Sequence, residues 1–300
     1  MYFNLDLIQI IIKKLFISTA ILALLASCTN KEAKNESTEE VKTENTISNE
    51  KIVSLNGAIT EILADLGEEN NLVGVDVTST YPASVKEKAT DLGHTRSLSI
   101  EALLALKPTK VYATDKDLNP EQIAQLKNAG IQTEIIKQDY SVEGTKELVK
   151  TVATSLNKQD FDAINTKIDT DLKAVKALAT KPKVLFIYAR GAGNLMVAGT
   201  NTPMEKIIGI AGGQNAITEF EDFKPLTPEA VVKSNPDYIL MFDKGLESIG
   251  GVDGVLKLEG VASTNAGKNK KIIAMDGQLV SGFGPRVGQA AAQLNQLLQK

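Results

Sequence analysis

Beyond residue 50, hydrophobic positions along the chain follow two alternating spacings. Short apolar runs of the strand type, at 51–55, 72–75 and 110–113, are separated by stretches in which apolar residues recur every three or four positions. One such stretch, 99–106, starts at a serine that can cap a helix, and it precedes the run at 110–113. Strands that alternate with helices predict an α/β fold built on a mainly parallel sheet.

The second half of the chain repeats this plan, with a strand-type run at 183–187 and a helical pattern at 203–210. The best internal match pairs LSIEALLALKPTKVY at 98–112 with LTPEAVVKSNPDYIL at 226–240. In each copy a hydroxyl residue can cap a helix, a glutamate lies in the first turn, and a proline ends the helix and leads into a strand. The repeat predicts two lobes of related plan.

A helical stretch at 142–180 separates the predicted N-terminal lobe, 51–141, from the predicted C-terminal lobe, 181–300. Its apolar residues fit two successive helices. A helix of about 20 residues spans about 30 Å, so we expect this segment to bridge the lobes as one rigid strut. The predicted fold class is therefore α/β, with two lobes of mainly parallel sheet joined by one long helix.

Residues 1–27 have the pattern of a signal peptide. Lys13 and Lys14 precede an apolar run from Leu15 to Ala26, which is too short to span a bilayer but suits a signal-peptide core. The run ends in Ala-Ser before Cys28, which resembles the lipobox at which bacterial lipoproteins are cut and acylated. Acyl chains on this cysteine would hold the protein at a membrane surface. The alternatives are an ordinary secretory signal with an incidental cysteine, or an N-terminal anchor.

Residues 28–50 are expected to form a lipidated, disordered tether. Positions 29–50, TNKEAKNESTEEVKTENTISNE, contain no aromatic residue and only three clearly apolar ones. A segment of this composition cannot bury enough apolar surface to offset its ordering entropy. Its root-mean-square reach is on the order of 25 Å, so we expect the folded part to begin near Lys51 and to stay close to the membrane.

Composition narrows the function classes. The formal charge is −4, from 33 basic and 37 acidic residues, so binding of nucleic acid by bulk electrostatics is not expected. The chain has one cysteine and one histidine, Cys28 and His94. That inventory excludes an intrachain disulfide and any zinc site that needs three or four such ligands. A Ser-His-Asp or Cys-His centre would have to use His94, so the composition argues against most metalloenzymes and most hydrolases.

A resemblance to a known family rests on the segments VGVDVTSTYP (73–82), DLGHTRSLSIEALLALKPT (91–109), VAGTNTPMEKIIGIAGG (197–213), LTPEAVVKSNPDYIL (226–240) and SGFGPR (281–286). With a lipobox, two lobes and one connecting helix, the chain resembles the substrate-binding proteins of ABC importers that have a single bridging helix. Within that group it is most similar to periplasmic haem-binding proteins. The resemblance covers about residues 51–300. It implies capture of haem outside the cytoplasmic membrane and delivery to an ABC permease dimer with its ATPase, with no catalysis by the protein itself.

Residue chemistry separates the cargoes that this group carries. Zinc and manganese carriers need several His and carboxylate ligands, which one histidine does not supply. Iron-siderophore and cobalamin carriers often use Trp and aromatic clusters, whereas Trp is absent here and aromatic residues make up 5% of the chain. Haem needs an axial ligand, an apolar slot and cations for its two propionates. Haem is the preferred cargo, and an iron-siderophore or cobalamin is the alternative.

The resemblance implies that Tyr81, in the STYP motif, is the axial ligand of haem iron. A phenolate is a hard oxygen donor that favours ferric iron, and Pro82 stiffens the loop. Without the resemblance, Tyr81 is an ordinary loop-anchoring residue. His94 is a possible second ligand, a contact on the distal face of haem or a surface residue. Many relatives carry Tyr at that position, so the chain departs from the family pattern there.

Only three of the 33 basic residues are arginines, Arg96, Arg190 and Arg286, and all lie in loop-like contexts. The planar guanidinium binds a carboxylate through two hydrogen bonds, so these arginines are candidates for contacts with haem propionates or with the pocket. The alternative is that one or more pair with a structural carboxylate or stack on an aromatic ring. Some relatives have a histidine ligand near position 190, which this chain lacks. Met196 and Met204 are expected to be core residues.

Glu101 and Glu229 occupy matching positions in the internal repeat. In the family that the chain resembles, one such glutamate in each lobe docks on arginines of the permease. Exposed anions on both lobes would set the register on a symmetric transporter dimer. The alternative is that the two glutamates only favour the starts of their helices.

Overall fold

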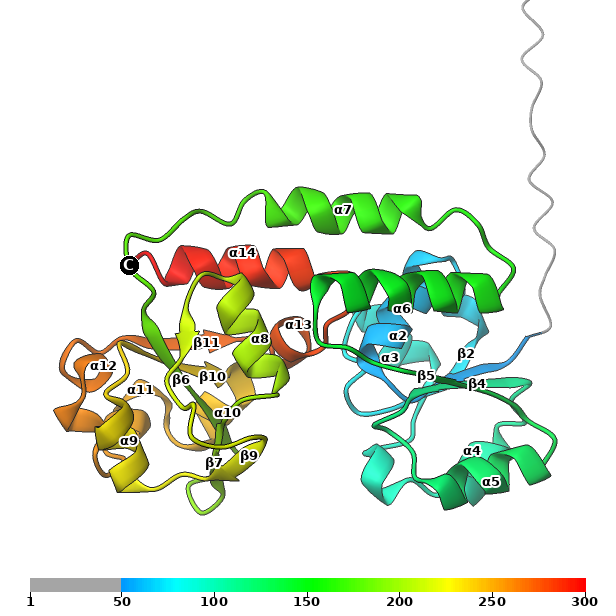
Figure 1. The fold of residues 1–300 in the computed structure, drawn as a ribbon. Coiled ribbons are helices and arrows are strands. Elements are labelled where there is room, and N and C mark those ends of the chain that lie inside the picture. Colours follow the sequence, from blue (N-terminus) through cyan, green and yellow to red (C-terminus); the bar gives the residue numbers. More distant parts are fainter. Residues whose placement is uncertain (1–49) are drawn as a thin grey trace, which may run out of the picture. The chain divides into compact units, whose positions relative to one another are not determined.

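Two sheets, each covered by helices, make up the described part of the chain (Figure 1). This computed structural model describes residues 50–300. The predicted signal peptide, Cys28 and nearly all of the predicted tether lie outside the described residues and stay predictions. Within residues 50–300 no helix is long and apolar enough to cross a membrane. The two mainly parallel sheets confirm the predicted α/β fold with two lobes.

The N-terminal lobe contains a parallel sheet of five strands in the order β3-β2-β1-β4-β5. Its strands are β1 (Ile52–Ser54), β2 (Leu72–Val75), β3 (Thr90–Asp91), β4 (Lys110–Thr114) and β5 (Gln132–Ile136). Its helices are α2 (Gly57–Asp65), α3 (Ala83–Lys88), α4 (Ile100–Ala105), α5 (Pro120–Asn128) and α6 (Val142–Ser155). The three predicted strand-type runs correspond to β1, β2 and β4, and the helix predicted before β4 is α4.

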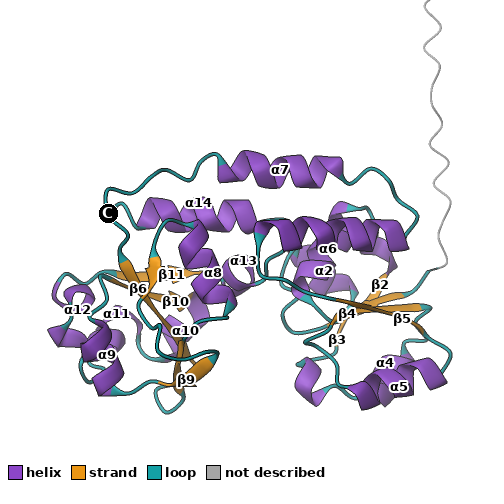
Figure 2. Cartoon of the chain, viewed as in Figure 1, coloured by secondary structure: helices purple, strands orange, loops and turns teal. Residues whose placement is uncertain are grey.

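Successive residues of β1 and of β4 face opposite sides of the sheet and enter two different cores. In β1, Ile52 belongs to the hydrophobic cluster that includes α2 and α6, whereas Val53 belongs to the cluster that includes α4 and α5. Tyr112 and Val111 of β4 divide in the same way. All four are fully buried, which explains why these strands are continuous apolar runs in the sequence. Figure 2 shows helices on both sides of this sheet.

The C-terminal lobe contains a sheet of order β11-β10-β6-β7-β9, with β8 paired to β6. Its strands are β6 (Lys183–Ala189), β7 (Leu195–Ala198), β8 (Gln214–Asn215), β9 (Phe223–Pro225), β10 (Tyr238–Phe242) and β11 (Ile272–Met275). β7 pairs antiparallel with β6 and β9, and the other pairs are parallel. Its helices are α8 (Pro203–Ile210), α9 (Pro228–Ser234), α10 (Asp243–Ser248), α11 (Gly251–Leu256), α12 (Asn265–Lys268), α13 (Gly277–Ser281) and α14 (Val287–Leu297).

The internal repeat corresponds to α4 followed by β4 in one lobe and α9 followed by β10 in the other. Ser99 and Thr227 cap these helices, because their hydroxyl oxygens accept hydrogen bonds from the N–H groups of Ala102 (3.1 Å) and Ala230 (3.2 Å). The predicted hydroxyl caps are therefore confirmed, and the two lobes build this helix–strand unit in the same way.

The connection between the lobes differs from the single strut of about 20 residues that we expected from helix geometry. α6 ends before Asn157, which adopts a left-handed backbone (φ 56°), and its buried face packs with α2 inside the N-terminal lobe. α7 (Asp162–Leu172) has 11 residues, so its helical rise is about 16 Å. It lies beside α14 (Figure 1). The two successive helices that the apolar spacing predicts are α6 and α7, and neither reaches the length of about 20 residues expected of a single strut.

A second connection is the SGFGPR segment, residues 281–286, which leaves the C-terminal lobe and inserts into the N-terminal lobe. Phe283 is 2% exposed, and its ring packs on Tyr140 with 5.4 Å between the centroids. The carbonyl of Phe283 accepts a hydrogen bond from the hydroxyl of Thr145 in α6 (3.0 Å). One hydrophobic cluster, which contains Phe283, consequently runs through both lobes.

Replacement of Phe283 by alanine should lower the free energy of unfolding by about 3–5 kcal/mol, because it removes a buried ring that joins the two lobes. Urea denaturation followed by circular dichroism measures this difference. Val232→Ala, at a residue that is 50% exposed, is the control and should change the free energy of unfolding by at most about 0.5 kcal/mol. A Phe283→Ala protein as stable as the control would contradict the insertion of this segment.

Candidate functional site

Three of the candidate residues lie in loops at the carboxyl ends of parallel strands. Tyr81 follows β2, His94 follows β3 and Arg190 follows β6 directly. In open parallel sheets ligands bind at this edge, because neighbouring loops converge there. A backbone hydrogen bond from the N–H of Val77 to the carbonyl of Gly93 (2.9 Å) joins the loops that carry Tyr81 and His94. These two loops therefore form one edge of the N-terminal lobe.

The loop that carries Tyr81 is held by a buried aspartate. Asp76 is 3% exposed, and its carboxylate accepts hydrogen bonds from the N–H and hydroxyl of Thr78 (2.9 and 2.6 Å) and from the hydroxyl of Ser79 (2.7 Å). The hydroxyls of Ser79 and Thr60 are a further 2.7 Å apart, which ties the loop to α2. Hydrogen bonds to a carboxylate are stronger than those between neutral groups, so this network fixes the backbone that leads to Tyr81.

Tyr81 lies against an arginine of the other lobe. Tyr81 is 46% exposed, and its ring centroid is 3.8 Å from Cζ of Arg286. Arg286 donates two hydrogen bonds to Glu61 of α2, from Nε to Oε2 (2.8 Å) and from Nη2 to Oε1 (2.6 Å). A guanidinium from the C-terminal lobe is thus inserted between a phenol ring and a carboxylate of the N-terminal lobe.

For Glu61 and for Arg286, burial and ion pairing shift the pKa in opposite directions. Burial raises the pKa of Glu61 above its usual range, and the hydrogen bond and charge of Arg286 only partly offset that effect. Burial also disfavours the charged form of Arg286, but the hydrogen bond and charge of Glu61 outweigh it, so the pKa of the guanidinium is raised. Arg286 therefore keeps its positive charge beside Tyr81 at any physiological pH.

A hollow of about 420 Å³ opens between the lobes. From the N-terminal lobe it is lined by His94 and Arg96. From the C-terminal lobe it is lined by Tyr188, Arg190, Asn194, Met196, Pro203, Met204, Phe223, Phe242 and Ser281. Its size is within the usual range of small-molecule sites. The lining contains two arginines and no Asp or Glu, so it favours an anionic ligand.

Both arginines of this lining are free of structural carboxylates. Within residues 50–300, no carboxylate lies within ion-pair distance of Arg96 or Arg190. Cζ of Arg190 lies 5.6 Å from the ring centroid of Tyr188. The structure thus brings Arg96 and Arg190 to one hollow. Arg286 and Tyr81 lie outside this lining. Arg286 instead pairs with a carboxylate and contacts an aromatic ring, which was the alternative to a propionate contact.

His94 lines the hollow and also caps the short helix at Thr95–Ser97. Its Nδ1 accepts a hydrogen bond from the N–H of Arg96 (3.3 Å). A neutral imidazole that accepts at Nδ1 carries its proton at Nε2. His94 is therefore arranged to donate a hydrogen bond to a ligand, and ligation of iron through Nε2 would require that proton to leave.

The predicted docking glutamates do not line the hollow. Glu101 and Glu229 are exposed and lie in the first turns of α4 and α9. The hydroxyl of Ser99 donates a hydrogen bond to the carboxylate of Glu101 (3.0 Å). These positions fit both an exposed docking anion and a helix-start residue, so docking on the permease stays a prediction.

The sequence did not predict one wall of the hollow. This wall, called the aromatic wall below, is formed by Tyr188, Phe223 and Phe242. These residues come from β6, β9 and the end of β10, and the rings of Tyr188 and Phe242 are 5.9 Å apart. Met196 and Met204, expected in the core, line the hollow as well, although Met204 is also fully buried. The alternation of side chains along β6 could have indicated the side of the sheet on which Tyr188 lies. No local pattern in the sequence indicates that β6 and β9 line the same hollow.

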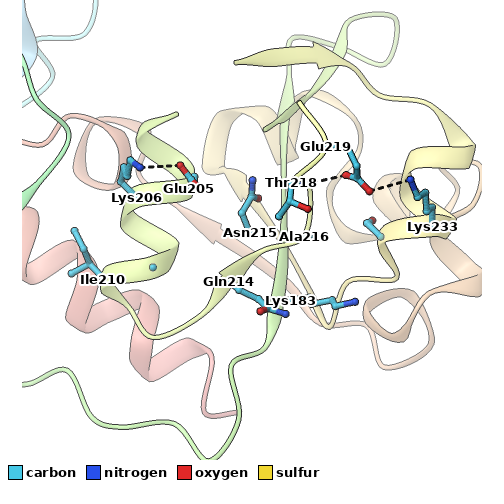
Figure 3. Close-up of a pocket in the computed structure, with 12 residues that line it drawn as sticks. Lys183, Glu205, Lys206, Ile210, Gln214, Asn215, Ala216, Thr218, Glu219 and Lys233 are labelled. Atoms are coloured by element: carbon cyan, nitrogen blue, oxygen red, sulfur yellow. Dashed lines mark hydrogen bonds and ion pairs between the residues drawn. The ribbon is translucent and has the colours of Figure 1, made fainter. Parts of the chain in front are cut away.

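A larger hollow, of about 840 Å³, lies at the amino end of β6, beside Lys183 (Figure 3). Its lysines Lys206 and Lys233 are paired with Glu205 (3.2 Å) and Glu219 (3.1 Å), and dashed lines mark both pairs. None of the candidate residues lines it. The hollow between the lobes is therefore the site that the sequence and the geometry support together.

Two α/β lobes with a hollow between them, lined by cations and aromatic rings, define a bilobal ligand-binding protein. The chain belongs to the periplasmic binding protein family, whose family model matches residues 52–279. Its relatives are transporter substrate-binding proteins and not enzymes, which confirms the expectation of no catalytic activity.

Named relatives indicate the kind of transporter. The chain is 28% identical to the uncharacterized ABC transporter substrate-binding lipoprotein YvrC of Bacillus subtilis, over 90% of this chain and 91% of that one. The structure of the periplasmic heme-binding protein RhuT of Roseiflexus sp. RS-1, in apo form, matches with a TM-score of 0.80 and 39% identity, over 83% of this chain and 98% of that one. A cobalamin-binding protein of Halobacterium salinarum is 25% identical over 64% of this chain and 53% of its own length.

The protein is therefore a substrate-binding protein of an ABC transporter, and the resemblance drawn from its sequence motifs is confirmed. This class implies a permease and an ATPase as partners and a location outside the cytoplasm.

Proposed function

We propose that the protein captures haem in the hollow between its lobes and delivers it to the permease. In this proposal Tyr81 is the axial ligand of ferric iron, the aromatic wall contacts the porphyrin, and Arg96 and Arg190 bind the propionates. The loop of Tyr81 is hydrogen-bonded to the loop of His94, and His94 lines the hollow, which supports assigning both loops to one ligand site.

The observation that carries this proposal is the contact between Tyr81 and Arg286. A phenol oxygen that binds ferric iron bears negative charge, and a nearby cation stabilises that charge. The guanidinium of Arg286 lies 3.8 Å from the ring centroid. Tyr81 is also half-exposed, whereas a tyrosine that only anchors a loop would be packed into the core.

The chemistry of the hollow supports a flat, dianionic ligand. Two arginines without carboxylate partners suit two propionates, since each planar guanidinium can bind one carboxylate through two hydrogen bonds. The aromatic wall offers ring faces and edges to an apolar macrocycle. The heme-binding protein RhuT, at 39% identity, adds support for the same cargo.

Cobalamin is the second candidate, because the Halobacterium relative is named for binding it. Cobalamin is bulkier than haem and has no pair of free carboxylates, so it gives Arg96 and Arg190 no matching partners. Cyanocobalamin that displaces haemin from the protein, or that binds more tightly in a separate titration, would favour this second candidate.

Haemin added to the protein should shift the Soret band. Tyr81→Phe should weaken haemin binding by about 100-fold or more. Loss of a residue that only supports a metal ligand costs about 10–100-fold, so loss of the ligand itself should cost at least as much. Spectrophotometric titration measures both effects. Tyr140→Phe removes a hydroxyl from the same lobe, outside the hollow, and is the matched control. A Tyr81→Phe protein with the affinity and spectrum of the control would disprove axial ligation by Tyr81.

Arg96→Gln and Arg190→Gln should each weaken haemin binding by about 10- to 100-fold, because each removes charge-assisted hydrogen bonds worth about 1.5–3 kcal/mol. Haemin dimethyl ester, in which both propionates are esterified, provides the matched comparison in the same titration. Its affinity should be equal for the wild type and for either variant. Equal losses with haemin and with the ester would assign these arginines to the fold rather than to the propionates.

The lipid anchor is part of the same proposal and rests on the lipobox before Cys28 and on the lipoprotein name of the Bacillus relative. Cys28→Ser should abolish incorporation of labelled fatty acid into the protein, because it removes the sulfur atom that is acylated. Growth of cells with labelled palmitate, followed by immunoprecipitation, measures the incorporation. A wild-type protein that takes up no label would contradict lipidation at Cys28.

A further inference from the structure

Glu61 has no role in the function proposed so far. It lies on α2, behind the loop of Tyr81, and is 3% exposed. A buried carboxylate is costly unless it is paired, and the partner of Glu61 is Arg286. Within residues 50–300, Glu61 is the one carboxylate that forms an ion pair with Arg286.

The geometry of this pair determines where the guanidinium plane lies. Nε and Nη2 of Arg286 each donate to a different oxygen of Glu61, at 2.8 and 2.6 Å. Two parallel hydrogen bonds hold both the position and the orientation of the planar group. The same guanidinium contacts the ring of Tyr81, whose centroid is 3.8 Å from Cζ.

The backbone around the pair leaves little room for a different arrangement. Arg286 is the residue that precedes α14, at the end of the inserted SGFGPR segment. A Cβ added at Gly284 would lie 3.1 Å from Cα of Ala58 and 3.5 Å from Oε2 of Glu61. The segment therefore approaches α2 closely, and the carboxylate of Glu61 meets the arginine where the two lobes touch.

We propose that Glu61 is a positioning residue for the ligand of haem iron, acting through Arg286 to hold the guanidinium against the ring of Tyr81. This inference rests on the proposed haem site and adds a residue to it. A carboxylate in one lobe orients a cation from the other lobe, and the cation stabilises the charge on the phenol oxygen that binds ferric iron.

A double-mutant cycle tests whether Glu61 acts through Arg286. Haemin dissociation constants are measured for the wild type, E61Q, R286Q and the double variant. E61Q should weaken binding by about tenfold, as outer-shell partners do at metal sites. The double variant should bind no more weakly than R286Q, because without the guanidinium Glu61 has nothing to orient. E147Q, an exposed glutamate of α6, is the matched control and should bind as the wild type does.

A spectroscopic measurement separates positioning from a merely structural role. The phenolate-to-iron charge-transfer band of the ferric complex should move in E61Q and stay unchanged in E147Q. If E61Q does not fold, E61D replaces it, because it keeps the charge but retracts the carboxylate by one methylene. E61D should also shift the band and weaken binding.

Two results would overturn this inference. One is wild-type affinity and an unmoved band in E61Q, or in E61D where E61Q does not fold. The other is an equal loss of affinity from E61Q in the wild-type and R286Q backgrounds. Failure of the proposed haem site is a different result, in which wild-type protein gives no Soret shift or Tyr81→Phe changes nothing.

Discussion

The structure depends on the insertion of residues 281–286 from the C-terminal lobe into the N-terminal lobe. Phe283 brings an apolar ring into the shared hydrophobic cluster, and Arg286 brings a charge that Glu61 must neutralise. Loss of one partner from a buried ion pair costs about 3–5 kcal/mol, because the other charge stays buried and unpaired. The segment is therefore held by both apolar packing and charge, and it sets how the two lobes meet.

This constraint also divides the arginines into two kinds. Arg286 binds other residues of the protein, because it donates hydrogen bonds to Glu61 and contacts the ring of Tyr81. Arg96 and Arg190 line the hollow and form no ion pair with a carboxylate of the part of the chain that the structure describes, so their charges are left for a ligand. A chain with a formal charge of −4 thus has a site lined by positive groups. Local charge, and not net charge, decides what kind of ligand such a hollow attracts.

Much of the fold could be predicted from local patterns. Apolar runs corresponded to β1, β2, β4 and β6, and the hydroxyl residues before α4 and α9 are helix caps. The apolar spacing also predicted two successive helices between the lobes, but not the left-handed turn at Asn157 that ends the first or the 11-residue length of the second. Helix α6 ends there and packs on α2, while α7 packs on α14. Such endpoints depend on lateral contacts that a periodic pattern does not contain.

By itself, the sequence determined the alternation of strands and helices, the small inventory of metal-binding side chains and the short set of candidate residues, because these follow from neighbours along the chain. Only the tertiary structure decided what each candidate does. Glu61 and Arg286 are 225 positions apart, and the aromatic wall combines residues of three strands. A contact over such separations depends on how sheets and helices pack, and the spacing of residues along the chain does not determine that packing.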